Sequence, residues 1–439
     1  MTSMADTVLT DTQTERLTTA KGLLSLSPIV VFLVLYPITS LIIGDFYKVP
    51  LTVAFIGASA WGFLTSRSLT FSGRVEAFSR AAGSSNIIYM VWIFILAGAF
   101  SSLADHTGAI SATVNLTLRF LPYELLIPGL FLAACFISLS IGTSVGTVVA
   151  LTPLAVEIAA EGGGDVALFV ATVLGGAFFG DNLSFISDTT IAATRSQNVA
   201  MNAKFKANLV IVLPAAVVTL LIYVFIGAGV EDFTPAAEDN YFLILPYLLI
   251  IALALAGVNV IIVLAAGITA SAVIALLSGF TMLDLAGFTG DGIDSMGSLI
   301  IITLLSAGML GLVKATGGIN WLLEVMTRRV KSQRGAKAVI ASLVSVVNVC
   351  TANNTVAILT VGSLSHKISD RYDIGGARTA SLLDTCSCIV QCLIPYGAQT
   401  LLAVGMAGIS PAAPWPYLYY PWALGLGVIV MILYRPKRR

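Results

Sequence analysis

Charged residues are scarce in this sequence. Asp, Glu, Lys and Arg make up 10% of its 439 residues, against roughly 25% in soluble domains. Hydrophobic residues make up 57%, and stretches long enough to cross the roughly 30 Å hydrocarbon layer recur from residues 23–43 to residues 415–434. Only helices or a closed barrel satisfy the backbone in lipid, and short alternating segments are not seen. The composition therefore predicts an all-α polytopic membrane protein.

Net charge and histidine are also lacking. The formal net charge is zero, which argues against a nucleic-acid partner. No histidine lies near the cluster Cys386, Cys388 and Cys392, so we expect packing residues there rather than a zinc site, and no cofactor. The polar first twenty residues lack the pattern of a removed signal peptide. We expect residues 1–22 to form a cytoplasmic tail.

The basic residues predict how the chain crosses the membrane. Suppose that the N-terminus is cytoplasmic and that the polar-tipped segments 123–160 and 337–366 each enter and leave on one side. Then 21 of the 23 Lys and Arg residues lie in cytoplasmic segments, among them Arg195, Lys204 and Lys206, as the positive-inside rule favours. Both termini are then cytoplasmic, as in a protein of the cell (inner) membrane. Each polar-tipped segment is predicted to be a helical hairpin, re-entrant in the favoured interpretation or else a pair of short spans.

Self-comparison reveals an internal duplication. LADHTGAI matches LVKATGGI at an offset of 209 residues, GTSVGTVVALT at 142–152 matches CTANNTVAILT at 208, and Asp181 matches Asp384 at 203. Each half then contains three spans, a hairpin, a span with an aspartate and a closing span, which makes five crossing helices plus one hairpin. An odd number of crossings relates the halves by an axis in the membrane plane. This is the inverted-repeat plan of secondary transporters, here with halves 23–230 and 231–439.

Three acids remain inside predicted spans: Asp181, Asp188 and Asp384. No Lys or Arg is predicted at comparable depth. A carboxylate in hydrocarbon costs about 2.5–3.5 kcal/mol, so an intramembrane acid indicates a functional site. The structural alternative is that Asp188 pairs with Arg195 and Asp384 with Arg378. Asp181 has no basic residue within ten positions.

Oxygen-bearing side chains and glycines surround these acids. Gly175, Gly176 and Gly180 predict an unwound segment with free carbonyl oxygens, and such oxygens suit an alkali cation. We predict sodium at Asp181 and Asp188. The alternative for each Ser or Thr is a hydrogen bond to a carbonyl of its own helix. The predicted cation-binding residues are Asp181, Asn182, Ser184, Ser187, Asp188, Thr189, Thr190, Asp384, Thr385 and Ser387.

The two hairpin tips are small and polar between apolar arms. Irregular backbone at membrane depth is tolerated where it lines a cavity, and the consecutive Asn353 and Asn354 are costly to bury without partners. Small residues that close helix contacts are the structural alternative. We expect both tips and two broken spans to meet near the midplane around a cation, with the tip residues Thr143, Ser144, Thr147, Thr351, Asn353, Asn354 and Thr355.

Two motifs resemble the NhaC family of sodium/proton antiporters. GAFFGDNLSFISDTT at 176–190 resembles that family's G-D-x-x-S-P-x-S-D-T-T stretch, and LLDTCSCIVQCLIPYGAQ at 382–399 resembles its E-D-S-G-T…L-I-P-W-N segment. The resemblance assigns functional roles to Asp181, Ser184, Ser187, Asp188, Thr189, Thr190, Asp384 and Pro395. The sequence departs from the family pattern at Phe185, Leu383, Tyr396 and Gly397, where the family has proline, glutamate, tryptophan and asparagine.

The resemblance implies sodium/proton exchange by alternating access. Asp181 and Asp188 would bind sodium when ionised and a proton otherwise, and Asp384 would act in the symmetry-related position. The tip sequence ANNT is also similar to the tips of dicarboxylate/sodium symporters of the ion transporter superfamily. That similarity implies a scaffold domain, a mobile transport domain and a homodimer in the lipid bilayer.

Two other functions are open at this point. The first is sodium- or proton-coupled transport of a small organic acid or amino acid, with Asn353, Asn354, Gln391, Tyr396 and Gln399 as solute ligands. The second is an intramembrane aspartyl protease built on Asp181 and Asp384. The duplication and the many hydroxyl groups argue against the protease, so we expect a transporter and not an enzyme.

Overall fold

The computed structural model describes residues 18–43, 51–110, 112–113, 122–162, 164–185, 187–227, 241–327, 330 and 332–433. This described part is helical throughout and contains no β-strand. Within it, eight helical stretches are long and apolar enough to cross a membrane. The all-helical integral membrane fold is therefore confirmed. The prediction for the N-terminal tail lies almost entirely outside the described residues.

The helices follow the order that the sequence predicts, with several shorter helices between them. The first half contains α1 (Thr19–Ile43), α2 (Leu51–Thr65), α3 (Phe71–Ala82), α4 (Ser85–His106), α6 (Leu126–Ile141), α7 (Ser144–Glu161), α8 (Val166–Leu183), α9 (Asp188–Ser196) and α10 (Met201–Gly227). The second half contains α11 (Leu245–Leu255), α12 (Val260–Leu277), α13 (Met282–Ser295), α14 (Gly297–Ala315), α15 (Gly318–Thr327), α16 (Gln333–Thr351), α17 (Asn354–Arg371), α18 (Gly376–Leu393), α19 (Ala398–Ala407) and α20 (Tyr419–Leu433).

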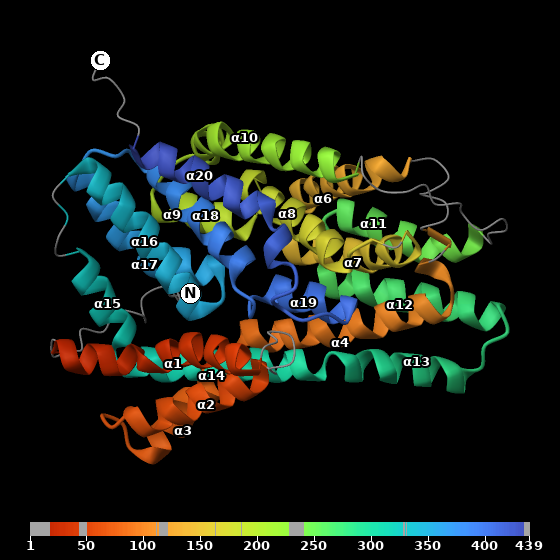
Figure 1. The fold of residues 1–439 in the computed structure, drawn as a ribbon, viewed down its shortest axis with the longest axis horizontal. Helices are drawn as coiled ribbons and strands as arrows, with labels where there is room; N and C mark the ends of the chain where they lie inside the picture. Colours follow the sequence, from red (N-terminus) through yellow and green to blue (C-terminus); the bar gives the residue numbers. More distant parts are fainter. Residues whose placement is uncertain are drawn as a thin grey trace, which may run out of the picture.

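The hairpins α6–α7 and α16–α17 turn by the same backbone conformation. Each first helix ends in a left-handed residue, Gly142 with φ 74° and Ala352 with φ 48°. Each next residue, Thr143 or Asn353, is extended and begins the second helix. The predicted helical hairpins are thus confirmed. They extend from opposite ends of the molecule, and their tips meet at its centre (Figure 1).

Two pairs of helices in the two halves begin at a constant spacing along the chain. α7 and α17 each span 18 residues. They begin at residues 144 and 354, which lie 210 positions apart (354 minus 144). α8 and α18 again span 18 residues and begin at 166 and 376, also 210 apart. This spacing differs from the predicted offsets of 208 and 203. They followed matching side chains, whereas backbone position pairs Asp181 with Gln391 and Asp384 with Leu174.

The glycines of α8 have a different role from the predicted one. α8 is regular through Leu183, so Gly175, Gly176 and Gly180 do not unwind it. A methyl group at Gly180 would overlap the side chain and carbonyl carbon of Ser138 on α6, and one at Gly176 would overlap α6 as well. These glycines allow α6 and α8 to pack closely. The break follows them and separates α8 from α9.

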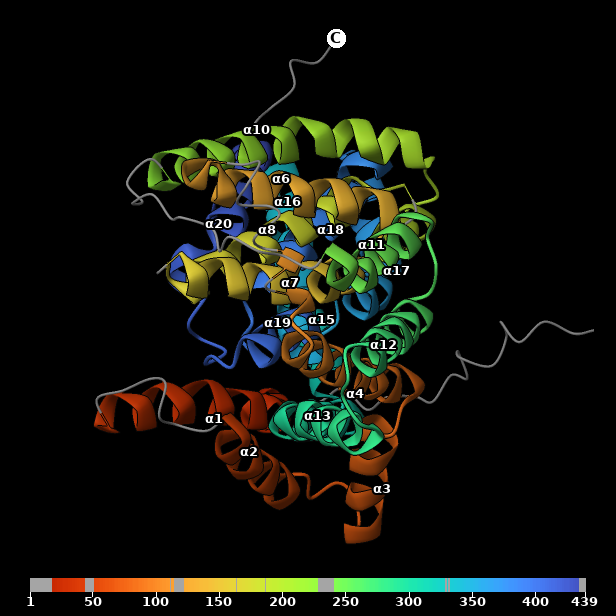
Figure 2. The same ribbon diagram turned by 90° about the vertical axis from the view of Figure 1, so that its right-hand side faces the viewer.

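The helices are arranged in two layers (Figures 1 and 2). One layer contains α1, α2, α3, α4, α13 and α14, and the other contains the two hairpins with α8, α10, α18 and α20. α19 packs against α4 and α14 of the first layer. Tyr396, between α18 and α19, packs edge-on against Phe32 of α1 and Phe55 of α2, at ring centroid distances of 5.3 and 5.5 Å. The functional site lies between the two layers.

Candidate functional site

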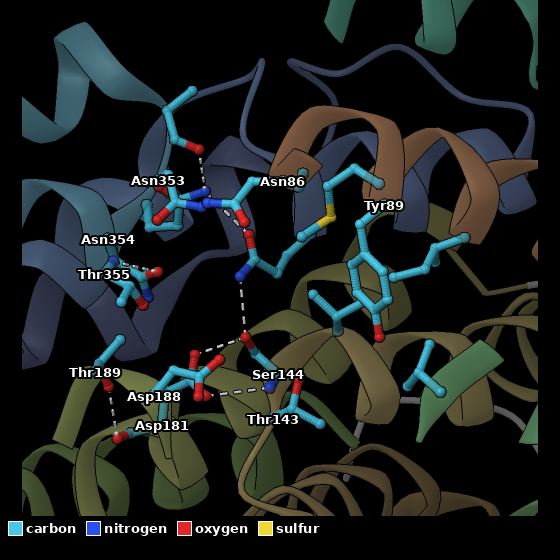
Figure 3. Close-up of a pocket in the computed structure, with 18 of the residues that line it drawn as sticks. Asn86, Tyr89, Thr143, Ser144, Asp181, Asp188, Thr189, Asn353, Asn354 and Thr355 are labelled. Atoms are coloured by element: carbon cyan, nitrogen blue, oxygen red, sulfur yellow. Dashed lines mark hydrogen bonds between the residues drawn. The ribbon is translucent and has the colours of Figure 1, made fainter. Parts of the chain in front are cut away.

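A cavity of about 320 Å³ lies where the two hairpin tips meet. One wall is formed by the tips, the α8–α9 break and the start of α19. The opposite wall is formed by the N-terminal part of α4, residues 257–259 with the first residue of α12, and α14. Figure 3 shows polar side chains from both hairpins pointing into this space. Residues of both tips and of the α8–α9 and α18–α19 breaks thus line one space, and a cation held there stays a prediction.

Asp181 lies at the cavity wall and is bonded to the first tip. Its side chain is 4% exposed. The backbone N–H of Ser144 donates to Asp181 Oδ1 at 3.1 Å, and Ser144 Oγ donates to Oδ2 at 2.6 Å (Figure 3). Ser144 is the first residue of α7, so the carboxylate lies at the positive end of that helix. No Lys, Arg or His side chain of the described residues pairs with Asp181.

This arrangement holds a negative charge without cancelling it. Hydrogen bonds from an N–H and an O–H stabilise a carboxylate, and the N-terminus of α7 adds only a partial positive charge, without the full charge of a basic side chain. The site around Asp181 therefore remains able to attract a cation. A basic partner in the same place would have neutralised it.

Two glutamines connect the first tip to the second. Gln399 Nε2 donates to Ser144 Oγ at 3.0 Å, and Gln391 Nε2 donates to Gln399 Oε1 at 3.0 Å. Gln391 Nε2 is also 3.0 Å from the carbonyl oxygen of Ala352 in the second tip. Asp181 and its backbone counterpart Gln391 thus each contact the hairpin tip of their own half. A change at one tip is linked to the other through these hydrogen bonds.

Asp188 is the second acid of the cavity. It is the first residue of α9 and is exposed to the cavity. No ion pair with Arg195 or with another described residue is present, so the structural alternative for Asp188 is not supported. Ser187 and Thr189 also line the cavity; their hydroxyls are 2.9 Å apart, and Thr189 Oγ1 donates to the carbonyl oxygen of Asp181 at 3.3 Å.

The second tip contributes neutral polar groups. Asn353 Oδ1 accepts from the N–H of Val356 at 2.9 Å and so begins α17. Asn354 is buried and its Nδ2 atom has no hydrogen-bond partner among the described residues. The predicted residues that line the cavity are Thr143, Ser144, Asp181, Ser187, Asp188, Thr189, Thr351, Asn353, Asn354, Thr355, Gln391, Tyr396 and Gln399.

The other predicted site residues lie behind the cavity wall. Thr385 Oγ1 donates to the carbonyl oxygen of Ser381 at 2.6 Å, and Ser387 Oγ donates to that of Asp384 at 2.9 Å, which is the helix-bonded alternative. Asn182 Nδ2 donates to the hydroxyl of Tyr420 at 3.1 Å. The predicted residues outside the cavity lining are Thr147, Asn182, Ser184, Thr190, Asp384, Thr385 and Ser387.

One expectation about charge was wrong. Lys204, predicted in a cytoplasmic segment, is 1% exposed, and its Nζ lies 2.8 Å from Oδ2 of Asp384, which is 0% exposed. The partner of Asp384 is therefore Lys204 rather than Arg378. The sequence did not indicate this because Lys204 precedes the apolar run of α10. The helix begins earlier, at Met201, and directs Lys204 and Asn208 inward.

The sequence also did not identify the wall that faces the tips. Asn86 and Tyr89 of α4, Asn259 before α12, and Thr303 of α14 line the cavity. Tyr89 OH donates to Asn259 Oδ1 at 3.4 Å. The only local signal in the sequence is Gly257, two residues before Asn259. In the structure, the φ of 73° at Gly257 marks a chain reversal within an apolar segment. Single polar residues near helix ends carry no pattern that distinguishes them from ordinary caps.

A polytopic helical protein with two opposed hairpins and an acidic, oxygen-lined cavity between two layers is a membrane transporter. Comparison with known sequences gives the family. The Na+/H+ antiporter family matches residues 6–228 and 240–435, so the chain belongs to it. The resemblance to NhaC antiporters is thereby confirmed.

Individual relatives are similar over most of their length. The Na(+)/H(+) antiporter NhaC of Bacillus subtilis is 25% identical over 407 residues, which cover 84% of this chain and 88% of the relative. The arginine/ornithine antiporter ArcD of Halobacterium salinarum is 23% identical, with 86% and 84% covered. Among solved structures, the YdaH transporter of Alcanivorax borkumensis matches with a TM-score of 0.43 and 16% identity, over 87% of this chain and 97% of that one.

Proposed function

We propose that this protein exchanges sodium ions for protons across the cell membrane by alternating access, with Asp181 as the carboxylate that binds either cation. The observation that supports the proposal is the environment of the Asp181 side chain. It is buried at a cavity wall and is held by the N-terminus of α7 instead of a basic side chain. The family and the Bacillus subtilis relative support the same exchange.

Competition for one carboxylate explains the coupling. Ionised Asp181 attracts sodium, and Asp188 with the hydroxyls of Ser187 and Thr189 supplies further oxygens from the same wall. A proton on Asp181 removes the negative charge, so sodium leaves. A buried carboxylate with neither cation is costly to carry through the membrane. The site therefore crosses the membrane only when it carries sodium or a proton, so sodium is exchanged for protons.

The two layers supply the movement. The cavity lies between them. A shift of the layer that contains the hairpins against the layer that contains α1, α2, α3, α4, α13 and α14 therefore opens the site to one side of the membrane or to the other. We infer that residues 23–230 and 231–439 are inverted repeats, because the hairpins extend from opposite ends. The proposal includes cytoplasmic N- and C-termini, the inner membrane and a homodimer. It is supported by the distribution of Lys and Arg and by the resemblance of the tips to symporter tips.

The test is exchange in vesicles. Purified protein is reconstituted with a pH-sensitive dye inside, and sodium is then added outside. We expect a sodium-dependent pH change that Asp181→Asn reduces at least about 100-fold, since one carboxylate carries both ions. Asp370→Asn, an exposed acid on α17, is the matched control and keeps exchange. No pH change in the unaltered protein, or full exchange by Asp181→Asn, refutes the proposal.

A second function is favoured by the size of the cavity. Its 320 Å³ equals roughly ten water volumes, which is more than a sodium ion needs. Asn353, Asn354 and Asn86 offer neutral hydrogen bonds, and one relative is named as an arginine/ornithine antiporter. Thermal-shift screening of amino acids and organic acids separates the two functions. Stabilisation by an organic compound only in the presence of sodium favours coupled solute transport.

A further inference from the structure

The only buried ion pair among the described residues lies outside the cavity. Lys204 Nζ contacts three oxygens: Asp384 Oδ2 at 2.8 Å, the carbonyl oxygen of Asn182 at 2.8 Å and Thr190 Oγ1 at 2.7 Å. An ammonium group has three N–H donors, so all are used. The oxygens come from α18, α8 and α9, and the lysine comes from α10.

This oxygen set is built for a cation. α8 ends at Leu183, so the carbonyl of Asn182 is one of the last in the helix and lies at its negative end. Asn208, one turn after Lys204, donates to the same carbonyl at 2.7 Å and to Asp384 Oδ2 at 2.8 Å. A carboxylate, a carbonyl and a hydroxyl are the donors that an alkali cation takes. Oδ1 of Asp384 is buried with no hydrogen-bond partner among the described residues, which leaves one more acceptor.

The pair has no counterpart in the other half of the chain. At the 210-residue offset, Asp384 corresponds to Leu174 and Lys204 to Pro414. The counterpart of Asp181 is the neutral Gln391. The duplication therefore leaves one tip-bound carboxylate in the cavity and one carboxylate that is already neutralised behind it.

We propose that the ammonium of Lys204 is a built-in cation that fills a second oxygen site, so that Asp384 balances Lys204 and carries no transported ion. Transported cations then use the cavity acids alone. Removal of the ammonium converts Asp384, the Asn182 carbonyl and Thr190 into a site for a free cation. The proposal refines the proposed exchange by limiting which acids take part, and its test needs no exchange activity.

The experiment measures cation-dependent thermal unfolding of Lys204→Ala in detergent. Asp181→Asn is included in every variant, so that the carboxylate bound to the first tip does not contribute, and Asp181→Asn alone serves as the reference that still contains Asp188. Sodium, lithium, potassium and methylammonium are compared with N-methyl-D-glucamine, which is too large for the site. We expect a small-cation rise in Tm of about 5 °C near saturation for Lys204→Ala. No such rise is expected for Asp181→Asn alone or for Lys204→Arg.

Removal of Asp384 provides the specificity control. Lys204→Ala with Asp384→Leu has no carboxylate at the Lys204 site, so its Tm responds to the choice of cation no more than that of Asp181→Asn alone. If Lys204→Ala is unstable, its yield of monodisperse protein is compared between sodium and N-methyl-D-glucamine extraction. Recovery in sodium supports the proposal. Three results overturn it: an equal response to all cations, a response that survives Asp384→Leu, or loss of Lys204→Ala in every salt while the variant that also carries Asp384→Leu folds.

Discussion

The hydroxyl of Ser144 offers the most direct test of how the first tip controls ion binding. Ser144 Oγ donates to Asp181 Oδ2 at 2.6 Å, and a hydrogen bond donated to a carboxylate stabilises its ionised form, which is the form that binds sodium. Ser144→Ala removes this bond together with the one that Gln399 Nε2 donates to the hydroxyl, and it keeps the backbone N–H bond to Oδ1. A hydrogen bond to a charged group contributes about 1.5–3 kcal/mol. At about 1.4 kcal/mol per factor of ten, the half-saturating sodium concentration rises roughly 10- to 100-fold at fixed pH.

The assay is sodium titration of exchange in vesicles at one pH. Ser140→Ala on the same hairpin is the matched control, because the Ser140 hydroxyl donates to the carbonyl of Phe136 in its own helix and not to the site. Its half-saturating sodium concentration is expected to stay within about twofold of the unaltered protein. A Ser144→Ala variant within that same range would show that the tip hydroxyl does not stabilise the sodium-binding form of Asp181.

Two further predictions concern the backbone that positions the site. Gly180→Ala overpacks α8 against Ser138 and is expected to lower the free energy of unfolding by about 1–3 kcal/mol. The control Gly425→Ala, in open space on α20, is neutral or stabilising by up to about 1 kcal/mol. Equal Tm values for the two variants contradict the packing argument. Ala352 is a left-handed residue with φ 48°, a conformation that costs residues other than glycine about 1–2 kcal/mol. Ala352→Gly is therefore expected to raise the free energy of unfolding by up to about 1 kcal/mol and to raise Tm in thermal melts. A fall in Tm refutes the reasoning.

The outcome for the acids shows where sequence reasoning succeeded. Asp181 was singled out because it stands in an apolar segment without a basic neighbour, and the structure places it at the tip as expected. Asp384 also stands in an apolar segment, although Arg378 lies six positions away, and it was interpreted in the same way, but it is paired with Lys204. Distance along the chain excludes only local partners. A lysine 180 positions away is found only when α10 and α18 are packed together.

The sequence by itself determined the membrane class, the helix order, both hairpins and the polar groups at their tips. These depend on composition and on local pattern, since apolar length sets a span and clustered polar residues interrupt it. Tertiary structure alone decided the 210-residue register, the close α6–α8 packing through glycine, and the division of the acids between the cavity and Lys204. Each of these depends on which side chains of distant helices face one another. The packing of the helices determines which side chains meet, and the order of residues along a single helix does not.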